Sequence, residues 1–471
     1  YPTDKLITVK KGRDLAFGGS VQAGKLQYYG KEYYFHYDPF VIDLLNVDSV
    51  SFMADSFEKN EEGLTTLVRV KNVLEQVSGT LEIDASSNKS GLQQKKYPEF
   101  PRFNSAKESY VYYDKSSIQR GVYARDKFFY RSNPFQLDSL DNFTNAGLNF
   151  PGTLVSGGIF PDIKETLGLQ PDYALGFVRG TGDAGLPLYG SKAKFTSDIA
   201  LNSRGLQGDG NLEYLSTKLS SKKLVFTPDS TLGRADTLVN LATTTGGKVP
   251  EVRGGDLFVR LEPAKDVLHT EKLRTPMTMF GGQAVLHGST DLKPTGMTGA
   301  GLADFSNATL NSELFKFETM RIKADTSDFR LTEQGDSAGI AFRTDNVNAN
   351  VDLDGRVGEF VSNGNETKVE FPVNQYICFM DRFRWYMDQG DIELESDKAA
   401  ASINDDLQLS GSNFISVRPG QDSLSFMAPK ARYDLKKHLI TASEVQFIRV
   451  ADALIAPDSS LLRIRRNAAM D

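Results

Sequence analysis

The sequence is poor in cysteine and histidine, and each shortage excludes a class of structure. Cys378 is the only cysteine, so no disulfide can form within the chain. The four histidines are His36, His269, His287 and His438. None has a partner at a metal-ligand spacing such as His-x-x-x-His. We therefore expect neither a disulfide framework nor a histidine-rich metal site, and we expect Cys378 to be a small buried thiol.

Long apolar runs and an excess of basic residues are also missing. No segment approaches the roughly 18 consecutive apolar residues that a membrane-spanning helix needs. Lys and Arg number 54 against 61 Asp and Glu, which gives a net charge of −7 and no basic surface for a phosphate backbone. We expect no transmembrane helix and no nucleic-acid partner.

Glycine and aromatic residues are plentiful. The chain has 41 Gly, 30 Phe and 18 Tyr, whereas long runs of Ala, Leu, Glu and Lys are scarce, and this balance favours strands and tight turns over helices. We predict a mainly β fold with few short helices, of which residues 61–77 and 163–169 are the best candidates. A length of 471 residues suits two to five domains at about 100–200 residues per domain.

An internal repeat is the most informative feature. Residues 187–226 align without a gap on residues 278–317, an offset of 91, and nine of the 40 positions are identical. By chance roughly two or three identities are expected. The identical pairs are Gly190/Gly281, Ala193/Ala284, Leu201/Leu292, Gly205/Gly296, Gly208/Gly299, Gly210/Gly301, Leu219/Leu310, Ser221/Ser312 and Phe226/Phe317. Glycines at this spacing indicate a β-hairpin or meander whose backbone turns tightly or approaches a neighbouring strand.

A fainter repeat lies earlier, at an offset of 95. An aromatic strand, a proline break and an Asp-containing turn around residues 28–45 recur around residues 123–140. Two similar offsets predict tandem β modules of about 90–95 residues, elongated or stacked. The predicted modules are residues 1–95, 96–186, 187–277, 278–365 and 366–471. The chain begins at Tyr1 with a strand-like pattern already running by Leu6, so we expect a fragment of a longer protein.

Two short motifs have the spacing of ligand-binding loops. Residues 180–185 match Gly-x-Gly-x-x-Gly, but a dinucleotide site needs a helix to open there, and the Pro and Gly that follow favour a turn. Asn350, Asp352 and Asp354 resemble the start of a calcium loop. The twelfth position, which should be a bidentate carboxylate, is Val361, so the three residues are only a weak metal candidate and we expect no metal and no cofactor.

An aromatic and basic cluster is the best candidate for a ligand-binding site. Its residues are Phe379, Arg382, Arg384, Trp385 and Tyr386, and it contains the only tryptophan. Such a cluster can form a stacking platform for sugar rings or a cation–π site, although large aromatics more commonly form the core. No carboxylate pair or nucleophile with an adjacent base stands out, so we predict no catalytic residues and no enzyme.

The C-terminal part carries a resemblance to known families. Residues 431–442, 445–448 and 453–458 resemble repeats of the lipopolysaccharide-transport, OstA-like envelope proteins, and the Gly-rich repeats are similar to those of AsmA or TamB-like envelope proteins. The resemblance covers about a quarter of the chain. It implies a long β structure in the periplasm that forms a groove for lipid chains, and it transfers no functional residue. The frequent Tyr, Pro and Asp depart from a continuous apolar groove.

These observations lead to one principal functional hypothesis and two alternatives. We expect a non-catalytic β-repeat protein in the periplasm or on the surface of a Gram-negative-type bacterium, acting as an envelope scaffold or as an adhesion and interaction module. Its partners are then other envelope proteins or a cell-surface polymer. The first alternative is a lipid-shielding β-groove conduit, which needs an open and continuous apolar face. The second is a carbohydrate-binding or carbohydrate-active module, which needs an exposed Trp385.

Overall fold

The computed structural model describes most of the chain. The described residues are Pro2, residues 6–92, Tyr97, and residues 99–333, 339–364, 367–396, 412–421 and 424–471. The chain folds into two compact units. Unit 1 comprises residues 1–214 and 220–233, and unit 2 comprises residues 215–219 and 234–471.

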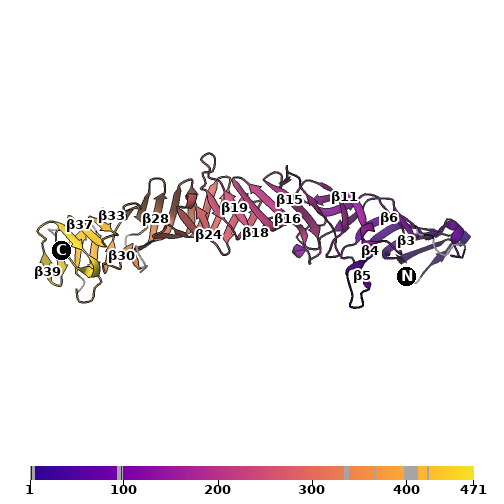
Figure 1. Ribbon diagram of the computed structural model, residues 1–471, viewed down its shortest axis with the longest axis horizontal. Helices are drawn as coiled ribbons and strands as arrows, with labels where there is room; N and C mark the ends of the chain where they lie inside the picture. The colour runs from indigo at the N-terminus through magenta and orange to yellow at the C-terminus, as the bar shows by residue number, and fades with distance from the viewer. Residues whose placement is uncertain are drawn as a thin grey trace. The chain divides into compact units, whose positions relative to one another are not determined.

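Unit 1 contains the first sixteen strands of the chain (Figure 1). They are β1 (Thr8–Val9), β2 (Leu15–Ala23), β3 (Leu26–His36), β4 (Val41–Lys59), β5 (Thr65–Arg69), β6 (Leu74–Glu82), β7 (Arg102–Ser105), β8 (Ser109–Tyr112), β9 (Phe128–Ser132), β10 (Gln136–Leu137), β11 (Asn149–Ser156), β12 (Ile163–Leu169), β13 (Leu175–Gly180), β14 (Leu186–Leu188), β15 (Ala193–Asn202) and β16 (Gly205–Tyr214). Two further strands, β17 (Thr217–Phe226) and β18 (Thr231–Ala235), have residues in both units.

Unit 2 contains the remaining strands. They are β19 (Thr237–Asn240), β20 (Val252–Gly254), β21 (Leu257–Glu262), β22 (Val267–Lys272), β23 (Met277–Met279), β24 (Ala284–Lys293), β25 (Gly296–Asp304), β26 (Ala308–Glu318), β27 (Arg321–Thr332), β28 (Ile340–Asp352), β29 (Val357–Ser362), β30 (Lys368–Phe371), β31 (Tyr376–Phe379), β32 (Arg382–Tyr386), β33 (Asp391–Glu395), β34 (Ser412–Ser416), β35 (Ser425–Ala428), β36 (Lys430–Asp434), β37 (Leu439–Ser443), β38 (Ile448–Val450), β39 (Ala453–Ile455) and β40 (Leu461–Ile464).

The fold is mainly β, as the composition predicts. Among the described residues the helical elements are short 3₁₀ turns: η1 (Lys11–Arg13), η2 (Ser86–Asn88), η3 (Gln119–Gly121), η4 (Asn145–Gly147), η5 (Phe280–Gly282) and η6 (Arg466–Ala468).

Both helix predictions are wrong. Residues 61–77 form β5 and the start of β6, and residues 163–169 form β12. Ile163 and Leu167 are buried while Lys164 and Thr166 are exposed. Two buried residues four positions apart can lie on one face of either a helix or a strand. The pairing of this segment with β11 shows that it is a strand.

Unit 1 is an antiparallel sheet that curls on itself. Its pairing order is β1–β2–β3–β4–β6–β8–β9–β11–β12–β13–β15–β16. Rings from strands far apart in this order meet in the core. Phe150 of β11 lies 5.6 Å from Phe52 of β4, and Tyr28 of β3 lies 5.1 Å from Phe103 of β7, a short strand that also pairs with β6. Contacts between such distant strands show that the curled sheet encloses its own core.

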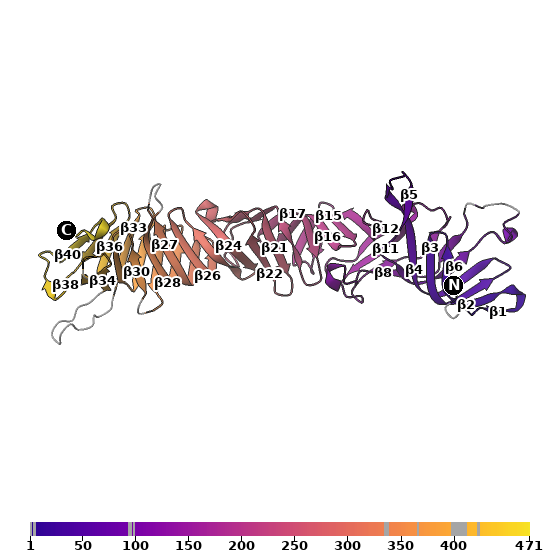
Figure 2. The ribbon, with the colours of Figure 1, turned by 90° about the horizontal axis from the view of Figure 1, so that it is seen from below.

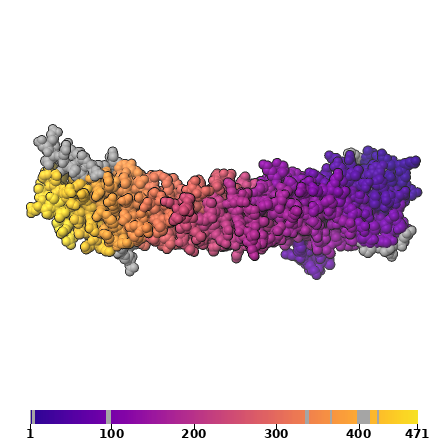
Figure 3. Space-filling view, turned by 90° about the horizontal axis from the view of Figure 1, so that it is seen from above, coloured from indigo at the N-terminus to yellow at the C-terminus, as the bar shows by residue number. Residues whose placement is uncertain are grey.

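The far half of β4 departs from this sheet. With β5 it forms a separate two-stranded ladder that projects from unit 1 (Figure 1), and Figure 3 shows it as an indigo-violet lobe. Phe57, Leu64 and Leu67 of this hairpin are each more than half exposed. The hairpin thus adds no core to unit 1 beyond its base.

Unit 2 begins as a meander and then divides into two sheets. Strands β21, β22 and β24 to β28 pair in that order. From β28 one ladder continues through β29, β32, β33, β36, β37 and β40, and a second through β30, β31, β34, β35, β38 and β39. Successive hairpins therefore alternate between the two sheets, and Figure 2 shows β33 and β36 on one side of the unit and β30, β34 and β38 on the other.

The inner face of unit 2 is an unbroken apolar row across thirteen paired strands. Its members are all buried: Leu261, Leu268, Leu292, Met297, Phe317, Ile322, Val351, Gly358, Trp385, Ile392, Tyr433, Ile440 and Ile464. Phe371 of the second sheet packs on Tyr433 with ring centroids 5.2 Å apart. The second sheet thus covers part of this row.

The sequence repeat is a repeat of structure. Each copy consists of a short strand, a turn and three long strands: β14 to β17 in the first and β23 to β26 in the second. The turn carries a left-handed pair in both copies, Tyr189-Gly190 with φ of 52° and 67°, and Phe280-Gly281 with φ of 55° and 64°. The offset of 91 therefore aligns backbone conformation as well as residues.

Close packing between a glycine and a phenylalanine ring explains two of the identical pairs in the repeat. A methyl group added at Gly208 would lie 2.6 Å from ring atoms of Phe195 and Phe226, and one added at Gly299 would lie 2.5 Å from the Ser289 carbonyl oxygen and 2.7 Å from the Phe317 ring. Gly208/Gly299 and Phe226/Phe317 are equivalent pairs in the repeat. In each copy the glycine leaves room for a phenylalanine ring on the neighbouring strand.

Strand pairing crosses the four predicted module boundaries. β6 pairs with β7 across residue 95, β13 with β15 across residue 186, β22 with β24 across residue 277, and β28 with β30 across residue 365. The five segments of about 90 residues are therefore joined by continuous ladders, and the compact divisions of the chain are units 1 and 2.

We predict that Gly208→Ala destabilises the chain by about 1–3 kcal/mol, because overpacking forces neighbouring rings from their positions. Chemical denaturation followed by circular dichroism measures the change. Gly180→Ala is the matched control, since a methyl there meets only Asp198 Oδ1 at 3.6 Å. A second change, Phe226→Leu, should recover part of the loss, and equal destabilisation by both glycine variants would contradict the proposed packing.

Candidate functional site

The predicted aromatic and basic cluster does not form one site. Phe379 is half-buried on β31, which belongs to the second sheet of unit 2, whereas the other four residues lie on β32 of the first sheet. On β32 the side chains alternate. Trp385 is buried, while Arg382 and Arg384 are exposed on the opposite face and Tyr386 is half-buried.

Trp385 is a core residue. It is 1% exposed, and its ring lies 5.3 Å from Phe329 and 6.1 Å from Phe305. A sugar ring stacks only on an accessible aromatic face, so Trp385 cannot serve as a surface platform. The prediction that Trp385 forms a stacking platform is therefore wrong, and the residue packs in the core.

The outward residues of β32 border a shallow groove over β29, β32 and β33. Its volume is about 390 Å³. It is lined by Glu359, Phe360, Val361, Asp381, Arg382, Phe383, Arg384, Glu393 and Glu395. Arg384 lies 3.3 Å from Glu359, and the Tyr386 hydroxyl donates to Glu393 at 2.8 Å, which raises the Tyr386 pKa. These are cross-strand pairs of the kind that line exposed sheet faces.

The weak calcium candidate is an Asp-Gly turn. Asp352 accepts hydrogen bonds from the backbone N–H groups of Asp354 and Gly355, at 3.1 and 2.9 Å, and from the Arg321 guanidinium at 2.5 Å. These bonds hold the pKa of the Asp352 carboxyl below its usual range. Asn350 lies two residues away on β28. The Asp352 carboxylate is thus committed to the turn and to Arg321, and within the described ranges no three His, Cys, Asp or Glu side chains gather into a metal-binding set.

Two other sequence candidates have structural explanations. Gly182 and Gly185 have φ of 72° and 69° in the turn between β13 and β14, so the Gly-x-Gly-x-x-Gly match is a turn. Cys378 is buried on β31, and burial raises the pKa of its thiol well above the usual value. A thiol in this state is a poor nucleophile.

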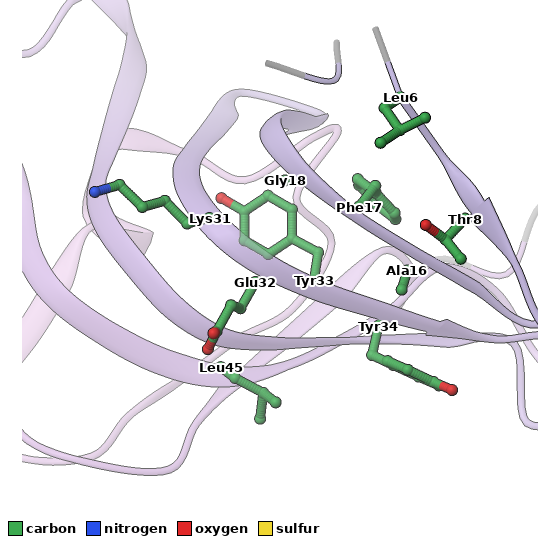
Figure 4. Close-up of a pocket in the computed structure, with 10 residues that line it drawn as sticks. All are labelled: Leu6, Thr8, Ala16, Phe17, Gly18, Lys31, Glu32, Tyr33, Tyr34 and Leu45. Carbon is green, nitrogen blue, oxygen red and sulfur yellow. The ribbon is translucent and has the colours of Figure 1, made fainter. Parts of the chain in front are cut away.

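The sequence did not predict a cleft that the structure shows in unit 1. The cleft measures about 720 Å³ and lies over β1 to β4 (Figure 4). It is lined by Leu6, Thr8, Ala16, Phe17, Gly18, Lys31, Glu32, Tyr33, Tyr34 and Leu45. We call it the β1–β4 cleft. Figure 4 shows Phe17 and Tyr33 side by side with Leu6 beyond Phe17, and Tyr34 directed to the opposite side.

Irregular pairing shapes this cleft. The register of β2 with β3 shifts between Phe17 and Gly19, and that of β3 with β4 shifts between residues 29 and 33. A side chain at Gly18 would lie 2.5 Å from the Lys31 carbonyl, so only glycine fits where the two bulged segments meet. The signal for this feature in the sequence was Gly18-Gly19 opposite an aromatic strand.

Tyr33 is a buried aromatic residue in the wall of the cleft. The residue is 2% exposed, its ring contacts Phe17 at 5.5 Å in an edge-on arrangement, and it lines the cleft. Burial raises the pKa of the phenol, which keeps the hydroxyl protonated and able to donate. Among the described residues no group accepts a hydrogen bond from it.

A partly buried polar cluster surrounds His438 in unit 2. The His438 Nε2 atom lies 3.5 Å from Glu333, and the Arg466 guanidinium donates to the same carboxylate at 3.0 Å. His438 is 7% exposed, and its Nδ1 atom lies 3.3 Å from the Tyr433 hydroxyl. Burial, together with the Arg466 charge, lowers the pKa of His438, although Glu333 and Asp434 act in the opposite direction.

Comparison with known proteins identifies no relative. A scan against models of known families finds no match, and a search of curated proteins returns none. Among the described residues, no helix has the length and apolar character that a bilayer crossing requires. The fold itself defines the class, which is an all-β protein.

Trp385 and Arg384 provide a matched test of the inward and outward faces of β32. We predict that Trp385→Ala costs about 3–5 kcal/mol of unfolding free energy, because a large core side chain is lost. Arg384→Ala should cost less than about 1 kcal/mol, as exposed ion pairs contribute little. Acrylamide should quench the single tryptophan weakly in the folded chain and strongly in denaturant. Strong quenching of the folded chain would place Trp385 at the surface instead.

His438 predicts a pH dependence of stability. Because its pKa is lower in the folded chain than in the unfolded chain, the unfolded chain binds the proton more readily, and stability falls as the pH drops from 7.5 to 5.5. Denaturation across this range should show a smaller fall for His438→Gln. His287→Gln, at an exposed position of β24, is the control and should follow the unmodified chain. Identical profiles for both variants would contradict the assignment.

Proposed function

We propose that the protein is a non-catalytic β-repeat protein that acts outside the cytoplasm as an envelope scaffold or interaction module. The observation that supports this proposal most directly is the apolar row of unit 2, which runs unbroken across thirteen paired strands. Close-packed interiors of this kind resist deformation. A continuous packed ladder is suited to holding surfaces in fixed positions.

The opposite face of the same ladder supports an interaction role. Its neighbouring row is polar on every strand and exposed or half-buried: Arg260, His269, Asp291, Thr298, Lys316, Lys323, Asn350, Glu359, Arg384, Glu393, Arg432, Thr441 and Arg463. Positive and negative groups alternate along β29, β32, β33 and β36. A mixed-charge face favours partners with complementary patterns over simple polyanions.

The conduit alternative has less support. It needs an apolar face that is both continuous and open, and the inner row is continuous but buried. Side chains at 0–4% exposure leave no space along Leu261 to Ile322, or from Trp385 to Ile464, for an acyl chain. A lipid chain would therefore have to displace these packed side chains.

The carbohydrate alternative can no longer rely on Trp385, which is buried. Only the outward residues of β32 remain available to contact a sugar. Arg382, Arg384 and Tyr386 border the groove of about 390 Å³, and Phe379 lies on the other sheet. The groove has no exposed tryptophan for a sugar ring. We therefore keep the scaffold proposal.

Fractionation of the native organism tests the proposal. An epitope-tagged chain should be found in the envelope fraction, and protease should degrade it in intact cells or after permeabilisation of the outer membrane alone, with a cytoplasmic enzyme as the protected control. Organic extraction of the purified chain should yield less than one acyl chain per molecule. Retention in the cytoplasm would overturn the location, and stoichiometric lipid would favour the conduit.

A further inference from the structure

The strand β5 (Thr65–Arg69) has one edge that no other described strand covers. Within the described ranges β5 pairs with β4 alone, as the outer strand of the hairpin that projects from unit 1 (Figure 2). Four of its five residues are exposed, and Leu67 is 54% exposed. Thr and Val, which favour strands, make up three of the five. An exposed strand edge of this kind is a template for pairing with another chain.

The backbone contacts of β4 show which groups of β5 point to the free edge. Leu67 lies opposite Asp55, and Arg69 lies opposite Met53. The Asp55 N–H donates to Asn145 Oδ1 at 2.8 Å and its C=O accepts from Asn145 Nδ2 at 2.8 Å, so both groups point away from β5. The Met53 N–H likewise donates to a carbonyl outside β5. Because directly opposed residues of an antiparallel pair face either toward each other or both away, the N–H and C=O groups of Leu67 and Arg69 point outward.

Charges of opposite sign flank the free edge. Glu61 and Glu62 lie at the tip of the hairpin, before β5 begins, and Arg69 is the last residue of the strand. All three side chains are exposed, and none forms an ion pair with another described residue. A second β5 in antiparallel orientation brings each Arg69 toward the acidic tip of the other hairpin. A parallel orientation would instead place like charges side by side, which is unfavourable.

A second copy also completes the sheet of the hairpin. A two-stranded hairpin is marginally stable in water, whereas three or more strands support one another. Antiparallel pairing of two β5 strands about Leu67 joins two hairpins into one four-stranded sheet and adds about six backbone hydrogen bonds, from the outward groups of Thr65, Leu67 and Arg69 in both copies. It also brings the two exposed Leu67 side chains together at the two-fold axis. The hairpin stands out from the body of unit 1 as a lobe (Figure 3), so its edge is accessible to a second copy.

We propose that β5 is a self-association site, through which two copies of this chain form a symmetric dimer by antiparallel β5–β5 pairing centred on Leu67. The same strand serves both copies, so the contact closes at two and does not propagate into a fibre. The dimer does not rest on the scaffold role, because the pairing depends only on the hairpin and not on where the protein is located.

Charge reversal tests the orientation of the pairing. Light scattering or sedimentation of the full chain should show a mass that rises toward twice that of the monomer as the concentration approaches about 1 mM. Arg69→Glu and Glu62→Arg each create two like-charge contacts in a dimer, and each should raise the dissociation constant at least about ten-fold. An equimolar mixture of the two variants should recover the dimer, since every contact in the mixed dimer again joins opposite charges. This recovery also shows that neither variant is misfolded.

Proline substitution tests the backbone pairing. Leu67→Pro removes an N–H that points away from β4, so it should leave the hairpin folded, as circular dichroism checks, and abolish the dimer. Leu67→Ala keeps the N–H and is the matched control, which should weaken the dimer less. A monomer at every concentration, a mixture that associates no more strongly than its two components, or a dimer of unchanged affinity in Leu67→Pro would each overturn the proposal.

Discussion

Burial of one apolar face along a continuous antiparallel ladder is the constraint on which unit 2 depends. Side chains alternate between the two faces of a strand, so an apolar row on one face fixes a polar row on the other. The row from Leu261 to Ile464 keeps this register across thirteen strands, and the row from Arg260 to Arg463 follows directly beside it. A slip of one residue on any strand would exchange the two rows. The hairpins that alternate between the two sheets satisfy this constraint, since each new hairpin extends one sheet and helps to cover the inner face of the other.

Glycine and aromatic residues solve the packing problem together. Large rings fill the space between layers, and glycines on adjacent strands admit them, as at Gly208 beside Phe226 and Gly299 beside Phe317. In unit 1, buried tyrosines additionally hold the curled sheet by donating to main-chain carbonyls. The Tyr123 hydroxyl donates to Phe226 O at 2.7 Å, and the Tyr113 hydroxyl donates to Leu175 O at 2.9 Å. The abundance of Gly, Phe and Tyr is thus a direct requirement of sheets that pack without helices.

The β1–β4 cleft occurs where this regularity is interrupted. Bulges beside Gly18 and at residues 29–33 break the register, and a buried hydroxyl remains without an acceptor among the described residues. The predicted cluster around Trp385 shows the opposite situation. There the register is regular, so neighbouring residues of β32 are sent to opposite faces and cannot act as one surface. Neighbouring residues of a regular strand therefore point to opposite faces of the sheet. At the bulges, by contrast, irregular pairing brings side chains of different strands together.

The sequence by itself determined the fold class and the repeat, because composition, turn residues and the offset of 91 are local properties of the chain. Tertiary structure alone decided that Ile163 to Leu169 is a strand, that Trp385 is core, and that ladders cross the boundaries near residues 95, 186, 277 and 365. It also decided the position of the cleft. The physical reason is that strand pairing joins residues distant in the sequence, and the choice of partner fixes which face of each strand is buried.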